Sequence, residues 1–228
     1  MTTRRGSPSV CRVTGQSEWR TSSTTPGLSY PAAPWSLVGS MWLTLFRVAE
    51  RIDDGRPAGL YGAAFVSYEE SSPLIYSELL VARPVSTEGH GRRVTITDIW
   101  VDCPASVAGG RELWGIPKRR CDLARVASYA GPVSTTQWCA REGGTPIASA
   151  WFRDVSGLAP RVPVRAGLWQ PGLPDTGGEE RTASMRGTSK VLPARARWDF
   201  HPDGALAWLA RARQLASIRQ ASFRISFG

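Results

Sequence analysis

The sequence predicts a mainly β (α+β) protein, built as a β-barrel or sandwich with a few flanking helices. Apolar runs of strand length, separated by short turns rich in Gly, Pro and Ser, occupy most of residues 40–102. Helical periodicity is confined to short stretches, and no internal repeat is found. Of the 228 residues, 42% are hydrophobic and 21% are charged, which is typical of a globular protein with a substantial core.

The chain is expected to divide into an extension and one domain. Residues 1–34 are rich in Ser, Thr, Arg, Gly and Pro and offer little to bury, so a flexible N-terminal extension is predicted there. Residues 35–228 are predicted to form a single domain.

The first half of this domain reads as strands followed by a short helix. Strands are predicted within SMWLTLFRVA, GLYGAAFVSYEE, LIYSELLVARPV and RRVTITDIWVD, residues 40–49, 59–70, 74–85 and 92–102. Pro104 and Ser106 then stand where a short helix can begin.

The second half is predicted to add more strands and the best helix of the chain. A hairpin that turns at REGG is predicted within residues 131–155. An irregular segment is predicted for residues 158–180, and one or two strands for residues 181–200. A helix is predicted within residues 201–220, where Leu206, Leu209 and Ala210 share one face, and residues 221–228 close as a strand.

Charge and cysteine content narrow the functional classes. The net charge of +9 raises the expectation of an anionic partner, but the arginines are scattered and no nucleic-acid-binding motif is present, so a basic enzyme without a nucleic-acid partner is favoured. No apolar run is long enough for a membrane helix, and the N-terminus lacks a signal peptide's apolar centre. The four cysteines lack CxxC spacing and only two histidines occur, so we expect no metal site, free thiols and a cytoplasmic protein.

Lys118 is the candidate reactive residue. Only two of the 28 basic residues are lysines, Lys118 and Lys190, and Lys118 lies in GGRELWGIPKRRCDL, where arginine would serve a surface role equally well. Lysine, unlike arginine, can lose its proton near neutral pH and attack a ketone to form an imine. Burial and a neighbouring cation, for which Arg119 is the candidate, would lower the pKa of the amine. The alternative is a solvated lysine in a basic turn.

The same segment resembles the acetoacetate decarboxylase superfamily. GRELWGIPKRR is similar to the family segment that carries the Schiff-base lysine, followed by a second cation, and its WGIPK form and the C-terminal LASIRQASFRISFG resemble a variant subgroup. IYSELLVARPV is similar to the family's Tyr-x-Glu segment, which implies that Glu78 is the acid–base group of the site. The resemblance extends from about Ser40 to the end. It implies a β-barrel or cone-like double sheet with a few flanking helices, and a homo-oligomer with no metal or organic cofactor.

Departures from the family pattern bear on the substrate. By alignment, the arginine that helps to hold the substrate carboxylate falls on Gly39, a second pocket glutamate falls on Ala63, and the second lysine falls on Arg119. The resemblance therefore implies that the imine-forming lysine and one acid–base group remain, with space at Gly39 and Ala63 for a larger ligand.

Several nearby residues admit two interpretations. Tyr76, Trp114 and Ile116 are candidates for the substrate pocket, with core packing as the alternative, and Cys121 is expected to be a buried structural thiol. Arg111 and Glu112 are expected to brace the turn before Lys118 as an ion pair.

The function predicted from the sequence is that of a Schiff-base-forming carbon–carbon lyase acting on an oxo-acid or ketone in specialised metabolism. Lys118, Glu78 and Arg119 are its predicted catalytic residues. The alternatives are an aldolase, dehydratase or cyclase with the same imine chemistry, or a binder of small molecules without catalysis.

Overall fold

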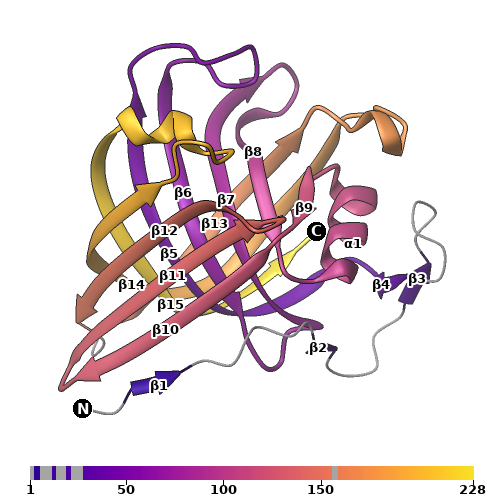
Figure 1. Cartoon of the computed structure of the whole chain (residues 1–228). Coiled ribbons are helices and arrows are strands. Elements are labelled where there is room, and N and C mark those ends of the chain that lie inside the picture. The colour runs from indigo at the N-terminus through magenta and orange to yellow at the C-terminus, as the bar shows by residue number, and fades with distance from the viewer. Residues whose placement is uncertain (1–2, 6–11, 14–18, 22–27, 156–158) are drawn as a thin grey trace.

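The computed structural model describes residues 3–5, 12–13, 19–21, 28–155 and 159–228 (Figure 1). This part of the chain holds one α-helix, α1 (Pro104–Trp114), and two short 3-10 helices, η1 (Pro174–Thr176) and η2 (Ala207–Arg211). The remaining elements are strands: β1 (Thr3–Arg5), β2 (Arg12–Val13), β3 (Trp19–Thr21), β4 (Ser29–Pro31), β5 (Trp35–Val48), β6 (Gly59–Tyr68), β7 (Leu74–Thr87), β8 (Gly91–Val101), β9 (Lys118–Arg120), β10 (Asp122–Ala130), β11 (Val133–Glu142), β12 (Thr145–Val155), β13 (Arg161–Gln170), β14 (Arg181–Phe200) and β15 (Arg213–Phe227).

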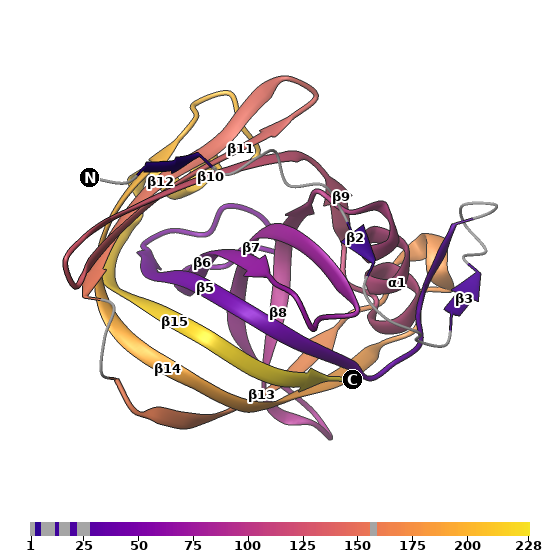
Figure 2. The same ribbon diagram turned by 90° about the horizontal axis from the view of Figure 1, so that it is seen from below.

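Most strands belong to one sheet that closes on itself. The order β14-β13-β8-β7-β6-β5-β15 returns to β14, because β14 also pairs with β15. From the far end of β14 the sheet continues through β12, β11 and β10 to β1. Figure 2 shows this ring with β10, β11 and β12 on one side and α1 near another. The mainly β class predicted from the sequence is confirmed.

Strand alternation sorts the buried side chains into two clusters. On β6, Ala63 and Phe65 belong to a cluster that joins β5–β8 to β10–β12, whereas Val66 belongs to a second cluster formed by ring strands and α1. On β7, Leu79 lies in the first cluster and Tyr76 in the second. Because successive side chains of a strand point to opposite faces, every even-numbered residue in this part of β7 faces the cluster that contains α1.

The predicted elements of the first half are confirmed, with longer bounds for several strands. Strands β5, β6, β7 and β8 cover nearly all of the four predicted apolar runs, and α1 begins at Pro104, a residue suited to the first helical position. The predicted hairpin is the pair β11–β12, which turns at Gly143 and Gly144, both with positive φ.

Two predictions for the second half are wrong. The helix expected within residues 201–220 is only the short η2, after which the chain forms β15, hydrogen-bonded to β5 on one side and β14 on the other. This sheet pairing overrides the local helical pattern. Residues 158–180 were expected to be irregular, yet they contain β13. Its Pro163 donates no backbone hydrogen bond, and the only β8 residue paired with β13 is Val94, which lies opposite Leu168.

Residues 28–34, the end of the predicted extension, lie in the described part of the structure, and the bounds of extension and domain stay a prediction. Within β4, Tyr30 is 2% exposed, and its hydroxyl donates to the Glu112 carboxylate on α1 at 2.6 Å. The remainder of the predicted extension lies largely outside the described residues. No helix in the described ranges is long and apolar enough to span a membrane.

The cysteines differ from the expectation of free thiols throughout. Cys103, immediately before α1, is disulfide-bonded, whereas Cys121 and Cys139 are free. A disulfide is more typical of an oxidising compartment, so it does not support the predicted cytoplasmic location. Cys121 is buried and burial raises the pKa of its thiol, as expected for a structural cysteine.

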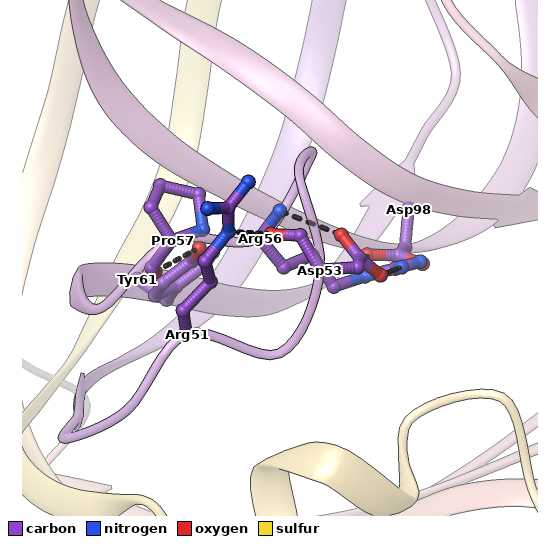
Figure 3. Close-up of polar contacts among 6 residues, drawn as sticks. All are labelled: Arg51, Asp53, Arg56, Pro57, Tyr61 and Asp98. Atoms are coloured by element: carbon purple, nitrogen blue, oxygen red, sulfur yellow. Dashed lines mark hydrogen bonds and ion pairs between the residues drawn. The ribbon is translucent and has the colours of Figure 1, made fainter.

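The loop between β5 and β6 is fixed to the sheet by Arg56 (Figure 3). The Arg56 guanidinium pairs with Asp98, a buried carboxylate of β8, and with Asp53 in its own loop. It also lies over the Trp208 ring, 5.5 Å from the centroid, and Tyr61 donates to the Pro57 carbonyl at 2.7 Å. The hydrogen bond to Asp98, together with electrostatic attraction, outweighs burial and raises the pKa of Arg56.

Candidate active site

Lys118 reaches the site from a short strand placed by α1. The helix ends at Gly115, whose φ of 61° is the left-handed conformation that glycine favours after a helix. The chain then turns into β9, where Lys118 pairs with Ile99 of β8 in parallel. Arg111 of α1 donates to the Lys118 carbonyl at 3.3 Å and pairs with Asp175. Arg111 therefore braces the turn, although its ion-pair partner is Asp175 instead of the expected Glu112.

The Lys118 amine lies among three oxygen atoms. Its Nζ is 2.9 Å from Glu78 Oε2, 2.9 Å from Ser106 Oγ and 3.2 Å from the Tyr76 hydroxyl. All four side chains are buried, Lys118 at 5% exposure and Ser106 at 0%. A lysine ammonium has three N–H bonds to donate, so this arrangement satisfies all of them. The other oxygen of Glu78 accepts a hydrogen bond from Tyr68 at 3.2 Å.

The pKa of Lys118 is raised, contrary to the prediction that burial and Arg119 would lower it. Burial is the largest single influence and by itself lowers this pKa. Attraction to the Glu78 carboxylate and the contacts with Tyr76 act in the opposite direction, and their sum prevails. The resting site therefore holds an ammonium–carboxylate pair. Burial also raises the pKa of Tyr68 and of Tyr76, so both phenols keep their protons.

Arg119 does not join this group. Its guanidinium is directed to Glu142, 3.5 Å away, and lies over the Trp100 ring at 4.7 Å. Its side chain is 49% exposed, and within the described residues no hydrogen bond or ion pair joins it to Lys118. The alternation along β9 explains the separation, because adjacent residues of a strand point to opposite faces.

The two positions expected to leave room for a larger ligand do not do so. A Cβ atom at Gly39 would lie 2.0 Å from the Ser67 carbonyl oxygen and 3.0 Å from the Phe223 ring, so this glycine allows a close backbone approach. Ala63 is fully buried in the cluster on the other face of β6, away from the face that Glu78 shares. Neither residue opens space beside Lys118.

The remaining candidates lie in the same cluster as the reactive group. Tyr76 contacts the amine directly, whereas Trp114 packs edge-on against Trp35 at 4.8 Å and against Phe227 at 4.6 Å. Ile116 is buried in this cluster as well. Trp114 and Ile116 thus belong to the buried cluster that contains Tyr76, and a contact with substrate remains a prediction for both.

Sequence reasoning missed three contributors. Ser106 and Gly110 lie four residues apart on one face of α1, and a Cβ at Gly110 would be 2.7 Å from Lys118 Cδ. This spacing in PASVAGGRELW is the signal that could have found them. Tyr68 carries no motif, and only the β6–β7 register, which sets it opposite Tyr76, reveals its place beside Glu78.

Among the residues that the structure describes, no group of three or more His, Cys, Asp or Glu side chains is arranged to hold a metal ion. The chemistry available at Lys118 is that of an amine, a carboxylate and hydroxyl groups enclosed by aromatic and aliphatic side chains.

Part of the sequence and the whole fold resemble known proteins. The family model described as acetoacetate decarboxylase (ADC) matches residues 50–156, which include Glu78 and Lys118. No curated protein matches the chain significantly. The matched segment is just under half of the chain, and both the superfamily and its WGIPK subgroup stay predictions.

Solved structures share the fold at low sequence identity. The acetoacetate decarboxylase of Legionella pneumophila matches with a TM-score of 0.60 and 15% identity, covering 87% of this chain and 85% of that one. An acetoacetate decarboxylase-like enzyme from Sphingomonas wittichii RW1 matches at 0.59 and 15%, covering 86% and 90%. The enduracididine biosynthesis enzyme MppR, complexed with pyruvate, matches at 0.57 and 15%, covering 89% and 90%. Another MppR structure contains the condensation product of pyruvate and imidazole 4-carboxaldehyde.

Proposed function

We propose that this chain is a lysine-imine enzyme that makes or breaks a carbon–carbon bond in an oxo-acid or ketone. The observation that carries the proposal is the enclosure of the Lys118 amine, 2.9 Å from Glu78, in a largely apolar cluster. A buried ion pair is a weak contributor to stability, so its presence beside two hydroxyl groups favours a chemical role.

We infer a role for each group from its position. The Lys118 ammonium passes a proton to Glu78, and the neutral amine attacks the carbonyl carbon of the substrate. Glu78 then returns protons to the carbonyl oxygen, which leaves as water. The protonated imine that remains withdraws electrons from an adjacent bond, and the apolar surroundings strengthen this effect by excluding water.

The arrangement favours condensation, dehydration or cyclisation over decarboxylation of a small β-keto acid. Lys118 is the only basic side chain buried in the described residues, and Glu78 would repel a carboxylate placed near it. The relative MppR, whose structures contain pyruvate and a condensation product, is consistent with such an outcome. Decarboxylation, the activity in the name of the matching family, is the second candidate.

Borohydride reduction with a panel of carbonyl compounds tests this function. The protein is incubated with acetoacetate, pyruvate, larger oxo-acids and neutral ketones, reduced, and measured by intact mass. We expect one adduct per chain for at least one compound and none with Lys118→Arg, which keeps the charge but removes the nucleophile. Saturable binding without an adduct would identify a non-catalytic binder instead. Homo-oligomerisation remains a prediction, for which the mass in solution is the direct measurement.

A further inference from the structure

The hydroxyl of Ser106 occupies a position that no role in the imine reaction yet explains. It is fully buried, and its oxygen lies 2.9 Å from the Lys118 amine. The Lys118 amine therefore hydrogen-bonds to Ser106, Tyr76 and Glu78, and Glu78 is the carboxylate among these three partners.

The helix holds this hydroxyl rigidly with respect to the lysine. Ser106 stands near the start of α1, and Gly110 follows one turn later on the same face. Because Gly110 has no side chain, the alkyl stem of Lys118 lies directly against the helix, 2.7 Å from where a Cβ would be. The helix face formed by Ser106 and Gly110 therefore lies along the lysine side chain: Gly110 is next to the alkyl stem, and Ser106 is next to the amine.

We propose that Ser106 aims the reactive lone pair of Lys118, a role that rests on the proposed imine function. The ammonium donates to three oxygens, and one of its protons passes to Glu78. The two N–H bonds that remain stay on Ser106 and Tyr76, which leaves the lone pair facing Glu78. The carbonyl compound must then enter on the Glu78 side of the amine.

This direction makes each proton transfer short. The C–N bond forms as the carbonyl π electrons move to oxygen, and that oxygen takes the proton from Glu78. The nitrogen, now with four bonds, returns one proton to the carboxylate. Glu78 then protonates the hydroxyl, which departs as water and leaves the protonated imine on Lys118. No co-reactant beyond the carbonyl compound is needed, and Glu78 ends as the carboxylate it was.

Ser106→Ala tests the proposal through the pH dependence of borohydride trapping. The titratable groups that face the Lys118 amine are Glu78 and Tyr76 of β7, and Tyr68 of β6 acts through Glu78. Without the serine oxygen, one ammonium N–H bond loses its acceptor, so the midpoint of trapping shifts to lower pH. The limiting rate at high pH falls about tenfold, because the lone pair is no longer held in one direction.

Two further variants distinguish an effect on the direction of the Lys118 lone pair from a general effect on folding. Ser106→Cys has similar volume but a weak acceptor, and we expect the same downward shift. Ser189→Ala removes another fully buried serine hydroxyl, which donates to the Lys190 carbonyl, and it should leave midpoint and rate unchanged. If wild type is trapped and both Ser106 variants keep the wild-type midpoint and limiting rate, this proposal is overturned. If wild type is never trapped, the imine function itself fails.

Discussion

The Lys118 amine and the Glu78 carboxylate lie 2.9 Å apart, and their side chains are 5% and 4% exposed. They come from β9 and β7, which are separated in the sheet by β8. Removing one partner of such a pair leaves a buried charge without compensation, at a cost of about 3–5 kcal/mol. The reactivity of the lysine and the stability of the fold are therefore linked through Glu78.

Replacing Glu78 by Gln should make Lys118 easier to deprotonate. The carboxylate is the leading influence that raises the pKa of Lys118, and burial, which lowers it, then dominates. The midpoint of borohydride trapping should move to lower pH, while overall turnover falls because the proton acceptor is lost. The pH profile of trapping measures this, and a midpoint that stays or rises would contradict the account.

The same replacement has a defined effect on stability. Because the pKa of Lys118 is raised in the folded protein, the stabilisation is fully present below the unfolded pKa of about 10.4 and is lost as pH rises through the folded value. We therefore expect Glu78→Gln to lower the free energy of unfolding by about 3–5 kcal/mol at neutral pH, measured in urea. The difference from wild type should narrow in strongly alkaline solution.

Arg119→Met should leave the trapping profile unchanged. The guanidinium pairs with Glu142 and lies over Trp100, so it does not act on the Lys118 amine. Glu142→Gln serves as a matched control that removes the partner of Arg119. An upward shift of the trapping midpoint in Arg119→Met would restore the role first assigned to this residue from the sequence.

Lys118 and Glu78 could be proposed as the catalytic pair from the sequence because their residue types are unusual in their surroundings. A lone lysine in an arginine-rich chain, and a glutamate within the apolar strand segment LIYSELLV, stand out without coordinates. In the structure the Lys118 amine and the Glu78 carboxylate lie 2.9 Å apart, and their catalytic roles stay a prediction. The strands in the first half of the domain could also be predicted from the sequence, because their apolar runs are bounded by turn residues.

The predictions that were wrong share a physical origin: each depends on contacts between residues that are distant along the chain. Ala63 on β6 and Arg119 on β9 point to the side of the sheet away from the Lys118 amine. Which side a strand residue faces depends on the strand register, which the local sequence does not specify. Gly39 looked like an opening, yet the Ser67 backbone fills the space. The helix predicted after residue 201 gives way to β15 because two neighbouring strands supply its hydrogen bonds.

Gly110→Ala should impair trapping more than folding. The new methyl group would lie 2.7 Å from Lys118 Cδ and 2.9 Å from Cε, so the lysine stem must move. Overpacking costs about 1–3 kcal/mol, offset in part by the better helix propensity of alanine. A displacement of the amine should slow trapping about 100-fold. Gly55→Ala, whose Cβ would meet only Asp53 Oδ1 at 3.5 Å, is the control, and equal trapping by both variants would refute this positioning.

Acetoacetate should be decarboxylated slowly. Lys118 is the only buried basic side chain that the described ranges contain, so no second cation holds the departing carboxylate, and Glu78 repels it. Release of carbon dioxide from acetoacetate measures this directly. Turnover in the usual enzyme range of about 1–1,000 per second would show instead that the protein is an acetoacetate decarboxylase.

The position of the covalent adduct tests the central claim most directly. Wild-type protein is incubated with a carbonyl compound that gives an adduct, reduced with borohydride and digested for peptide mapping by mass spectrometry. The account predicts that the added mass lies on Lys118 and is absent from Lys118→Arg. An adduct found on Lys190 or the N-terminal amine, and never on Lys118, would contradict it.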